Sequence, residues 1–373
     1  MIKGISSVTA SVLLTMMEAE RRIVSSKKFL RLNQISLAVD YTLQADTAQS
    51  RYTHSIEVAN VVQIMNQNIS LKLGINLDYR GCGRIVGLLH DIGHTAFGHL
   101  GERTLNGICR AISNNKIGFE GNSNNYITID KNRLLDGMDK ETRNYILASL
   151  AKHPEELYPE QSYLQKIIER ATLEDSLYLR NNGFKLKENL SSTIQCQIMD
   201  VADENAYIIS DIIDSLNILS KKELKEIFEK EIPEKCKIDF TSALAKGKNS
   251  FRMFMNNIFI KFVENFTFNE NGVLIAIDQD LEELRNVLAA INRKYVLNNP
   301  RILELRAENK DILETVFNYH FNGDGTDIPS SFYKRQFFLA KTREEKIKVV
   351  RNMCGSFTDK GIKIEMKRIS KGI

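Results

Sequence analysis

This chain of 373 residues has few cysteines, few prolines and no long apolar run. Its five cysteines, at positions 82, 109, 196, 236 and 354, have unrelated spacings and do not form a disulfide framework. They indicate reduced thiols and a cytoplasmic location. The apolar stretch Val8–Met17 is short and is broken by Thr9, Ser11 and Thr15, so we expect neither a signal peptide nor a membrane span.

The chain also lacks a strong charge of either sign, because 51 Lys and Arg against 47 Asp and Glu give a net charge of +4. Nucleic-acid binders usually show a concentrated basic face instead. The basic clusters at Arg21–Arg22, Lys27–Lys28 and 360–371 fit solvated helix faces best. They leave contacts with polyanions open, either nucleoside triphosphates or single-stranded nucleic acid.

The scarcity of proline and the helical spacing of Glu, Lys, Leu and Ile predict an all-α fold. A single core rarely grows beyond about 250–300 residues. We therefore predict a helical core in residues 1–220 and a helical C-terminal lobe in residues 221–373 that packs on it. Local patterns predict two long helices, over His54–Asn66 and Gln195–Ile218, and three loops, over 114–125, 181–183 and 322–329. The YITI sequence at 126–129 is compatible with a short strand.

Histidine is unevenly distributed in the chain. Four of the six histidines lie within residues 54–99, and three of them stand in LLHDIGHTAFGH. A lone histidine on an apolar face is usually structural, and a single His-Asp pair often arises by chance. Here, however, the pair closes an apolar run and is followed by two Gly-His pairs. The joint pattern favours a metal site over structural histidines.

The ligand types limit the metal. Imidazole and carboxylate together favour Mn²⁺ or Mg²⁺ and are compatible with Fe²⁺, Zn²⁺ or Co²⁺. Cys82 is the only cysteine in this stretch, so a thiolate zinc site is not expected. His90 and Asp91 are neighbours, and neighbours on a helix diverge by about 100°. Both reach one ion only if the helix is irregular there or points its axis at the metal, and Gly93 would permit such an irregularity.

Three blocks, SRYTHSIEVA, LLHDIGHTAFGHLGE and MDVADENAY, resemble the ordered blocks of HD-domain deoxynucleoside triphosphate triphosphohydrolases, the dGTPase group. Weaker similarity continues through GFEGNSNN, LAKHP and VVRNMCGSFTDK, so it extends from about residue 50 to about residue 360. Asn124 and His153 replace the family's usual Gln and Tyr. Thr95 and Ala96 replace two prolines, which concerns loop stiffness more than chemistry.

The resemblance implies an enzyme that hydrolyses deoxynucleoside triphosphates, dGTP foremost, to deoxynucleoside and tripolyphosphate. The implied metal ligands are His54, His90, Asp91 and Asp203. Asp200 is a rival for the last position, but Tyr207 completes the DxxxY motif with Asp203. An ion held there would polarise a phosphoryl oxygen and lower the pKa of a bound water.

Further roles follow for the neighbouring polar residues. His99 is a candidate general acid-base for the 5′-oxygen, because its ordinary pKa suits proton transfer. If this segment is helical, Glu102 lies one turn after His99 and would orient the His99 ring. His94 is a second candidate for proton transfer. Arg51 is placed to bind a phosphate. The resemblance implies further substrate contacts, which are Asn122, Lys152, Tyr207 and Asp211. In a helix, Asp203, Tyr207 and Asp211 would line one face.

Two other functions remain open. The His-Asp site equally suits another HD phosphohydrolase, either a nucleotidase or a cyclic-nucleotide phosphodiesterase, although the blocks after Asp91 favour the triphosphohydrolase. A nucleotide-sensing or nucleic-acid-binding protein with a residual site is the third reading, against which the intact ligands and the His99–Glu102 pair argue. The resemblance also implies a homo-oligomer.

Overall fold

The structure is a computed structural model that describes residues 10–37 and 50–371. In these residues the chain forms seventeen α-helices and one two-stranded antiparallel hairpin, β1 (Phe266–Phe268) and β2 (Leu274–Ala276). The all-α fold class predicted from the sequence is therefore confirmed. The first nine helices are α1 (Ala10–Ser25), α2 (Lys27–Arg31), α3 (Arg51–Leu73), α4 (Gly83–Leu89), α5 (Gly98–Ile112), α6 (Gly121–Lys131), α7 (Lys140–Ser149), α8 (Tyr163–Asn181) and α9 (Ile194–Ile218). The others are α10 (Lys221–Glu231), α11 (Glu234–Ala245), α12 (Lys248–Glu264), α13 (Gln279–Ile291), α14 (Pro300–Asn322), α15 (Ser331–Leu339), α16 (Arg343–Gly355) and α17 (Asp359–Ser370).

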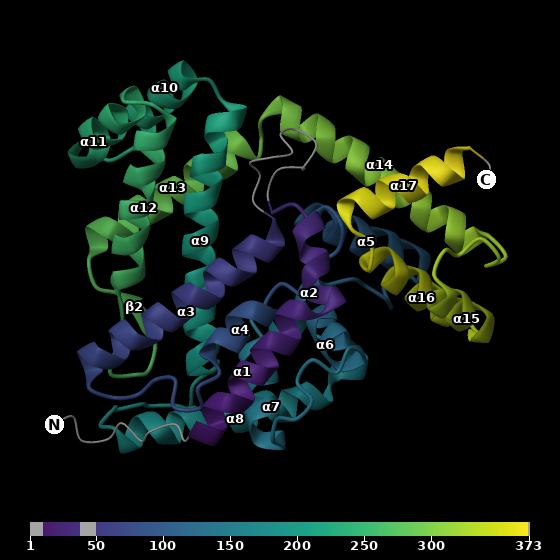
Figure 1. The fold of residues 1–373 in the computed structure, drawn as a ribbon, viewed down its shortest axis with the longest axis horizontal. Helices are drawn as coiled ribbons and strands as arrows, with labels where there is room; N and C mark the ends of the chain where they lie inside the picture. The colour runs from purple at the N-terminus through teal and green to yellow at the C-terminus, as the bar shows by residue number, and fades with distance from the viewer. Residues whose placement is uncertain (1–9, 38–49, 372–373) are drawn as a thin grey trace.

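The buried apolar side chains form three clusters. The largest is built mainly from α1, α3, α4 and α7 to α9, the second from the C-terminal half of α9 with α10 to α13, and the third from α5 with α14 to α17. Helix α9 runs through the middle of the molecule and contributes to the first two clusters (Figure 1). Residues after 221 thus contribute to all three clusters, because Val263, Phe266 and Phe268 belong to the first. The division into a core and one C-terminal lobe stays a prediction.

Both predicted long helices are confirmed, and each has a defined start. Helix α3 begins after Ser50, whose side chain accepts a hydrogen bond from the Thr53 N–H, and it ends at Gly74, which has φ 69°. Helix α9 begins after Thr193, and the buried Asp175 carboxylate accepts a hydrogen bond of 2.7 Å from the Ile194 N–H. These caps and anchors fix the two helices on which His54 and Asp203 stand.

The sequence misled at α6. The predicted strand at 126–129 is wrong, and the predicted loop at 114–125 is wrong from residue 121 onward, because both segments lie in this helix. The cause is the Glu120 side chain, which accepts hydrogen bonds from the Asn122 and Ser123 N–H groups and so caps the helix. An Asn-rich segment that reads as a loop thus becomes helical through a cap outside the Ser, Thr, Asp and Asn set.

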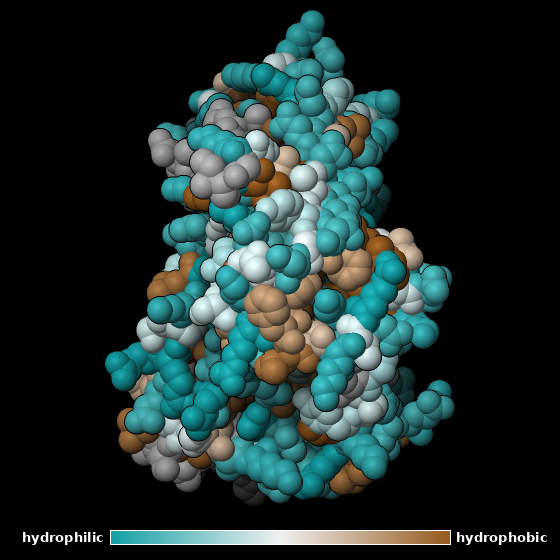
Figure 2. Space-filling model, turned by 90° about the vertical axis from the view of Figure 1, so that its right-hand side faces the viewer, coloured by the Kyte–Doolittle hydropathy of each residue, from teal (hydrophilic) through white to brown (hydrophobic). Residues whose placement is uncertain are grey.

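The state of the cysteines and the character of the helices and of the surface can be compared with what the composition predicts. All five cysteines are free thiols. Among the described residues, none of the helices combines the length and apolar character needed to cross a bilayer. Hydrophilic side chains predominate on the face shown in Figure 2, and the apolar ones stand in separate groups.

Gly93 has a packing role rather than a conformational one. Its backbone is outside the left-handed region, but a Cβ at this position would lie 2.3–2.6 Å from backbone atoms of Asn125, Asn124 and Gly121. The absence of a side chain therefore lets the loop after α4 touch the backbone of α6.

We expect Gly93→Ala to destabilise the fold by about 1–3 kcal/mol, because the new methyl group meets backbone that cannot move alone. Gly107→Ala is the matched control. Gly107 is exposed in the middle of α5 with open space around its Cβ position, so this change should stabilise by about 0.5–1 kcal/mol. Urea unfolding of both variants measures the difference, and equal stability would contradict the close contact.

Candidate metal centre and substrate cavity

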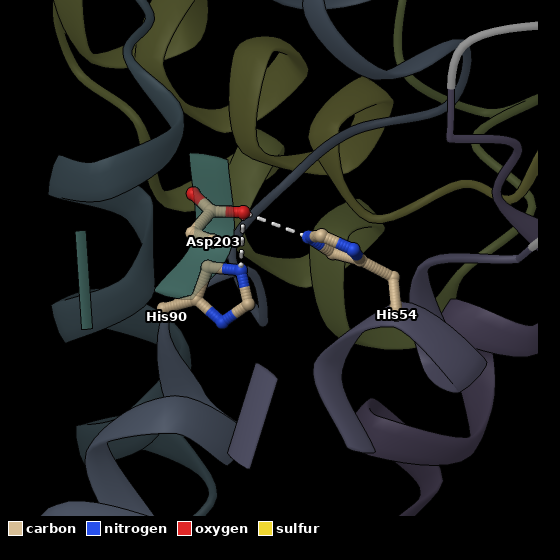
Figure 3. Close-up of side chains that lie close together, drawn as sticks. All are labelled: His54, His90 and Asp203. Carbon is tan, nitrogen blue, oxygen red and sulfur yellow. Dashed lines mark hydrogen bonds and ion pairs between the residues drawn. The ribbon is translucent and has the colours of Figure 1, made fainter. Parts of the chain in front are cut away.

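Three helices bring two imidazoles and one carboxylate to a single point. His54 lies in the first turn of α3, His90 directly follows α4, and Asp203 lies on α9. One oxygen of Asp203, Oδ1, is 2.8 Å from His54 Nε2 and 3.4 Å from His90 Nε2 (Figure 3). The ligand atoms of all three lie within 4.8 Å of one another.

The donor set fits a divalent cation. His90 is buried, and its Nδ1 lies 2.7 Å from the Gly87 carbonyl oxygen, which can only accept, so this nitrogen carries the proton. The lone pair is then on Nε2, which has no hydrogen-bond partner among the described residues. A buried acceptor without a donor, beside a second imidazole and a carboxylate, is what a bound cation would satisfy.

Asp91 borders this group without joining it. Helix α4 ends at Leu89, so the predicted irregularity is present and Asp91 lies in the following turn. Its Oδ1 is 3.6 Å from His90 Nε2 and 3.0 Å from His94 Nε2, while Oδ2 accepts a hydrogen bond from Arg51. Its role as the fourth ligand stays a prediction.

Asp203 rather than Asp200 lies with the histidines. The Asp200 side chain is 61% exposed, and its Oδ1 is 2.8 Å from Lys152 Nζ. The same ammonium group is 2.5 Å from Asp203 Oδ2. Lys152 therefore bridges the two carboxylates, and only Asp203 reaches the imidazoles.

Paired charges keep the carboxylates ionised. Burial raises the pKa of Asp203, but the charges of Lys152 and His90 and hydrogen bonds with His54 and His90 together hold it well below its usual value. Burial also raises the pKa of Asp91, and the charges of Arg51, His90 and His94 together with a hydrogen bond from His94 lower it well below its usual value. Conversely, burial lowers the pKa of Lys152 while Asp203 and Asp200 raise it above its usual value. Each buried charge thus has an opposite charge in contact, as its desolvation requires.

A second cluster, formed by His94, His99 and Glu102, adjoins the first through Asp91. As predicted, α5 places Glu102 one turn after His99, with His99 Nδ1 3.1 Å from Glu102 Oε2. The His99 side chain is 55% exposed, whereas Glu102 is largely buried. Burial raises the pKa of Glu102, but the hydrogen bond with His99 and the charges of His94 and His99 lower it to about 2. Because Glu102 is ionised, it can only accept, so His99 Nδ1 carries the proton.

Both clusters open into one cavity of about 650 Å³. Nearly all the site residues predicted from the sequence line it, namely Arg51, His54, His90, Asp91, His94, His99, Glu102, Asn122, Lys152, Asp203 and Tyr207. Asp211 is the exception, since it is buried outside the lining and accepts a hydrogen bond from Asn292. Burial raises the pKa of Asp211 well above its usual value. Asp211 lies one turn from Tyr207, and its contact with substrate stays a prediction.

Sequence reasoning missed the walls of a second, adjoining cavity of about 310 Å³. It shares His99, Arg103 and Tyr207 with the first cavity and is also lined by Arg293 and Arg306. Arg293 lies in a short π-helical segment, Asn292–Val296, that follows α13. Arg103, Arg293 and Arg306 are far apart in the sequence, and no local pattern predicts that they line one cavity. The one available signal is that Arg103 directly follows Glu102.

Comparisons with known proteins agree with this geometry. The HD domain family matches residues 51–207. The chain is 30% identical over 224 residues to deoxyguanosinetriphosphate triphosphohydrolase-like protein 2 of Mesorhizobium japonicum, which covers 53% of this chain and 44% of the relative. It is 28% identical over 337 residues to a deoxyguanosinetriphosphate triphosphohydrolase-like protein of Geobacter metallireducens. That match covers 85% of this chain and 74% of the relative. A third relative with that name, from Neorickettsia sennetsu, is 23% identical over 371 residues, and the match covers 91% of this chain and 86% of the relative.

The aligned part thus spans less than half of the Mesorhizobium relative, and also only 48% of a similar protein of Bordetella pertussis. Within the chain, the HD match begins at Arg51 and ends at Tyr207, so it contains both histidine clusters and Asp203. Residues 51–207 thus match the HD domain family, and the chain is similar to deoxyguanosinetriphosphate triphosphohydrolase-like proteins. The matched part contains His and Asp side chains that could hold a metal ion.

Proposed function

We propose that this protein hydrolyses deoxynucleoside triphosphates, dGTP foremost, to a deoxynucleoside and tripolyphosphate. Water adds to the α-phosphorus, the bond from that phosphorus to the 5′-oxygen breaks, and the 5′-oxygen takes up a proton. The observation that carries the proposal is the shared cavity. It holds a metal-ligand group, a hydrogen-bonded His99–Glu102 pair and the cations Arg51 and Lys152. The names of the relatives support the substrate class.

The side chains divide the work. A divalent cation held by His54, His90 and Asp203, with Asp91 as the predicted fourth ligand, would polarise a phosphoryl oxygen. Lys152 adds an ammonium group within the same cavity for the phosphates. The contact of Arg51 with Asp91 uses Nη1, and its Nε and Nη2 atoms have no hydrogen-bond partner in the part of the chain that the structure describes. The several negative charges of a triphosphate could contact Arg51 and Lys152 while these cations keep their pairs with Asp91 and Asp203.

Proton transfer to the leaving oxygen falls to His99. The ionised Glu102 accepts from His99 Nδ1 and so fixes the tautomer, as a carboxylate does for other catalytic imidazoles. His94 is less suited, because its ring is buried and its Nε2 contacts Asp91. Tyr207 and Asn122 remain proposed substrate contacts on the walls of the cavity. The homo-oligomer and the single-stranded nucleic acid contact stay predictions.

The reaction is tested by its products. Incubating the purified chain with each deoxynucleoside triphosphate and Mn²⁺ or Mg²⁺ should give deoxynucleoside and intact tripolyphosphate, resolved by ion-exchange chromatography. We expect dGTP to turn over fastest. Release of monophosphate with pyrophosphate, or of single phosphates, would assign another HD chemistry. No turnover of any substrate, alone or in mixtures, would favour a sensing protein.

The metal assignment is tested by three variants. His54→Ala and Asp203→Ala should lose bound metal and lower kcat/KM by more than about a hundredfold, since changes outside the ligand shell already cost about 10–100-fold. Asp200→Asn is the control, because Asp200 contacts Lys152 but no imidazole. It should keep its metal content, measured by elemental analysis, and the helical signal should persist in all three. A variant of His54 or Asp203 that keeps turnover would refute the site.

The acid-base assignment is tested by a matched pair of histidines. His99 and His153 both line the cavity, and each has a side chain that is 55% exposed. His99→Gln should lower kcat by about 10²–10⁴-fold with metal content unchanged, because general acid catalysis supplies that range. His153→Gln should leave kcat within a few-fold of the wild type. An equal effect of the two changes would show that His99 does not transfer the proton.

A further inference from the structure

A separate cavity of about 380 Å³ is lined by residues of α2, α6, α15 and α16. Its cationic residues are Lys28 and Arg31 on α2 and Lys131 at the end of α6. Asn and Ser side chains complete the polar wall, and no Asp or Glu of the described residues lines it. It shares no lining residue with the catalytic cavity.

The charges of this cavity are not balanced in the way those of the metal centre are. Burial lowers the pKa of Lys28, and the charges of Arg31 and Lys131 lower it further. Burial and the Arg351 charge lower the pKa of Lys131. In contrast, the Lys152 and Arg51 side chains at the candidate active site each contact a carboxylate, which raises their pKa.

Arg31 is the central cation of this cavity. Its guanidinium donates hydrogen bonds to four backbone carbonyls, those of Gly355, Phe357, Ile92 and His94. Carbonyl oxygens fix its position but do not cancel its charge. Asp359, whose charge acts on Arg31, is itself engaged by the N–H and hydroxyl of Ser36. Lys28 and Arg31 are partly buried and Lys131 is exposed, and none of the described Asp or Glu residues lines the cavity beside them. Such clustered positive charge favours an anion from outside the chain.

From these observations we propose that the cavity between α2, α6, α15 and α16 binds a phosphate-bearing small molecule, with the phosphate on Lys28, Arg31 and Lys131. A phosphate group offers several acceptor oxygens and a negative charge, which match clustered Lys and Arg donors. The volume is within the range of small-ligand pockets. Phe332 and Tyr333 stand in the same wall, and Lys131 Nζ lies 6.0 Å from the Phe332 ring centroid. An aromatic face beside the cations would accept the base of a nucleotide.

The cavity reaches the back of the loop that bears Asp91 and His94. Arg31 Nη2 donates to the His94 carbonyl oxygen at 2.5 Å, and Asn124, another lining residue, donates from Nδ2 to the Gly93 carbonyl oxygen at 2.6 Å. A ligand bound there would contact side chains that hold the catalytic loop. The proposal does not rest on the proposed hydrolysis, because its evidence is confined to this second cavity.

Isothermal titration of the full chain with inorganic phosphate, pyrophosphate and dGMP tests the site. EDTA is present so that no metal holds phosphate at the HD centre. The double variant Lys28→Gln with Lys131→Gln should bind at least about tenfold more weakly than the wild type, because charged hydrogen bonds are lost. Lys27→Gln is the control, with the same type of substitution at an exposed neighbour in α2 that does not line the cavity.

Lys152→Gln excludes the other phosphate site, since it removes the ammonium group of the catalytic cavity and should leave the titration unchanged. Failure of the wild type to bind any probe would overturn the proposal. So would binding that is lost in Lys152→Gln yet kept in the double variant, or equal weakening by Lys27→Gln. Tighter binding of dGMP than of phosphate, reduced by Phe332→Ala, would identify a nucleotide. Equal binding of all probes would identify the phosphate group alone as the recognised part.

Thermal unfolding in phosphate-free buffer gives a second readout that does not depend on hydrolysis. A ligand that binds only the folded chain raises Tm with concentration. Phosphate should therefore raise Tm in the wild type and in Lys27→Gln but not in the double variant. If all three respond equally, the stabilisation comes from elsewhere and the proposal fails.

Discussion

One carboxylate, Asp203, is the constraint on which the site depends. It lies on α9 and contacts His54 of α3 and His90 at the end of α4. The site therefore forms only if these three helices pack closely together. A partly buried carboxylate beside two imidazoles is costly to desolvate unless a positive charge accompanies it. Lys152 supplies that charge in the structure, and a bound cation would supply more of it.

Asp91 lies between the candidate metal-ligand group and the cluster of His94, His99 and Glu102. Its two oxygens contact Arg51 and His94, while its neighbour His90 belongs to the metal-ligand group. Helix α4 ends at Leu89 and the chain continues as a turn, so the adjacent residues His90 and Asp91 contact different partners. A metal ligand and a residue that organises the next cluster can thus be consecutive in the sequence. The HD pair is best understood as a junction between the two clusters.

The sequence predicted the elements that depend on local patterns. Helix α9 was predictable from apolar spacing, and the positions of His54, His90 and Asp203 from their motifs. Helix α6 was not, because a cap by Glu120 overrides the loop-like composition that follows it. The clustering of Arg103, Arg293 and Arg306 and the cavity around Arg31 were also hidden, since they depend on contacts between segments far apart in the chain. Gly93 was noticed for the wrong reason, as its role is close packing rather than an unusual φ.

The loop after the HD pair shows how the structure replaces a missing local constraint. Two prolines expected from the family are Thr95 and Ala96 here, so backbone rigidity cannot come from pyrrolidine rings. Hydrogen bonds from outside the loop take that role. Arg31 and Asn124 hold the His94 and Gly93 carbonyls, and the Asn125 side chain donates to the His90 carbonyl at 2.6 Å. Phe97 has φ 63°, a conformation costly for a residue with a side chain, and its N–H donates to Asp359 at 2.7 Å. Asp359 opens α17, so the position of His99 depends on the C-terminal helices as well as on its own motif.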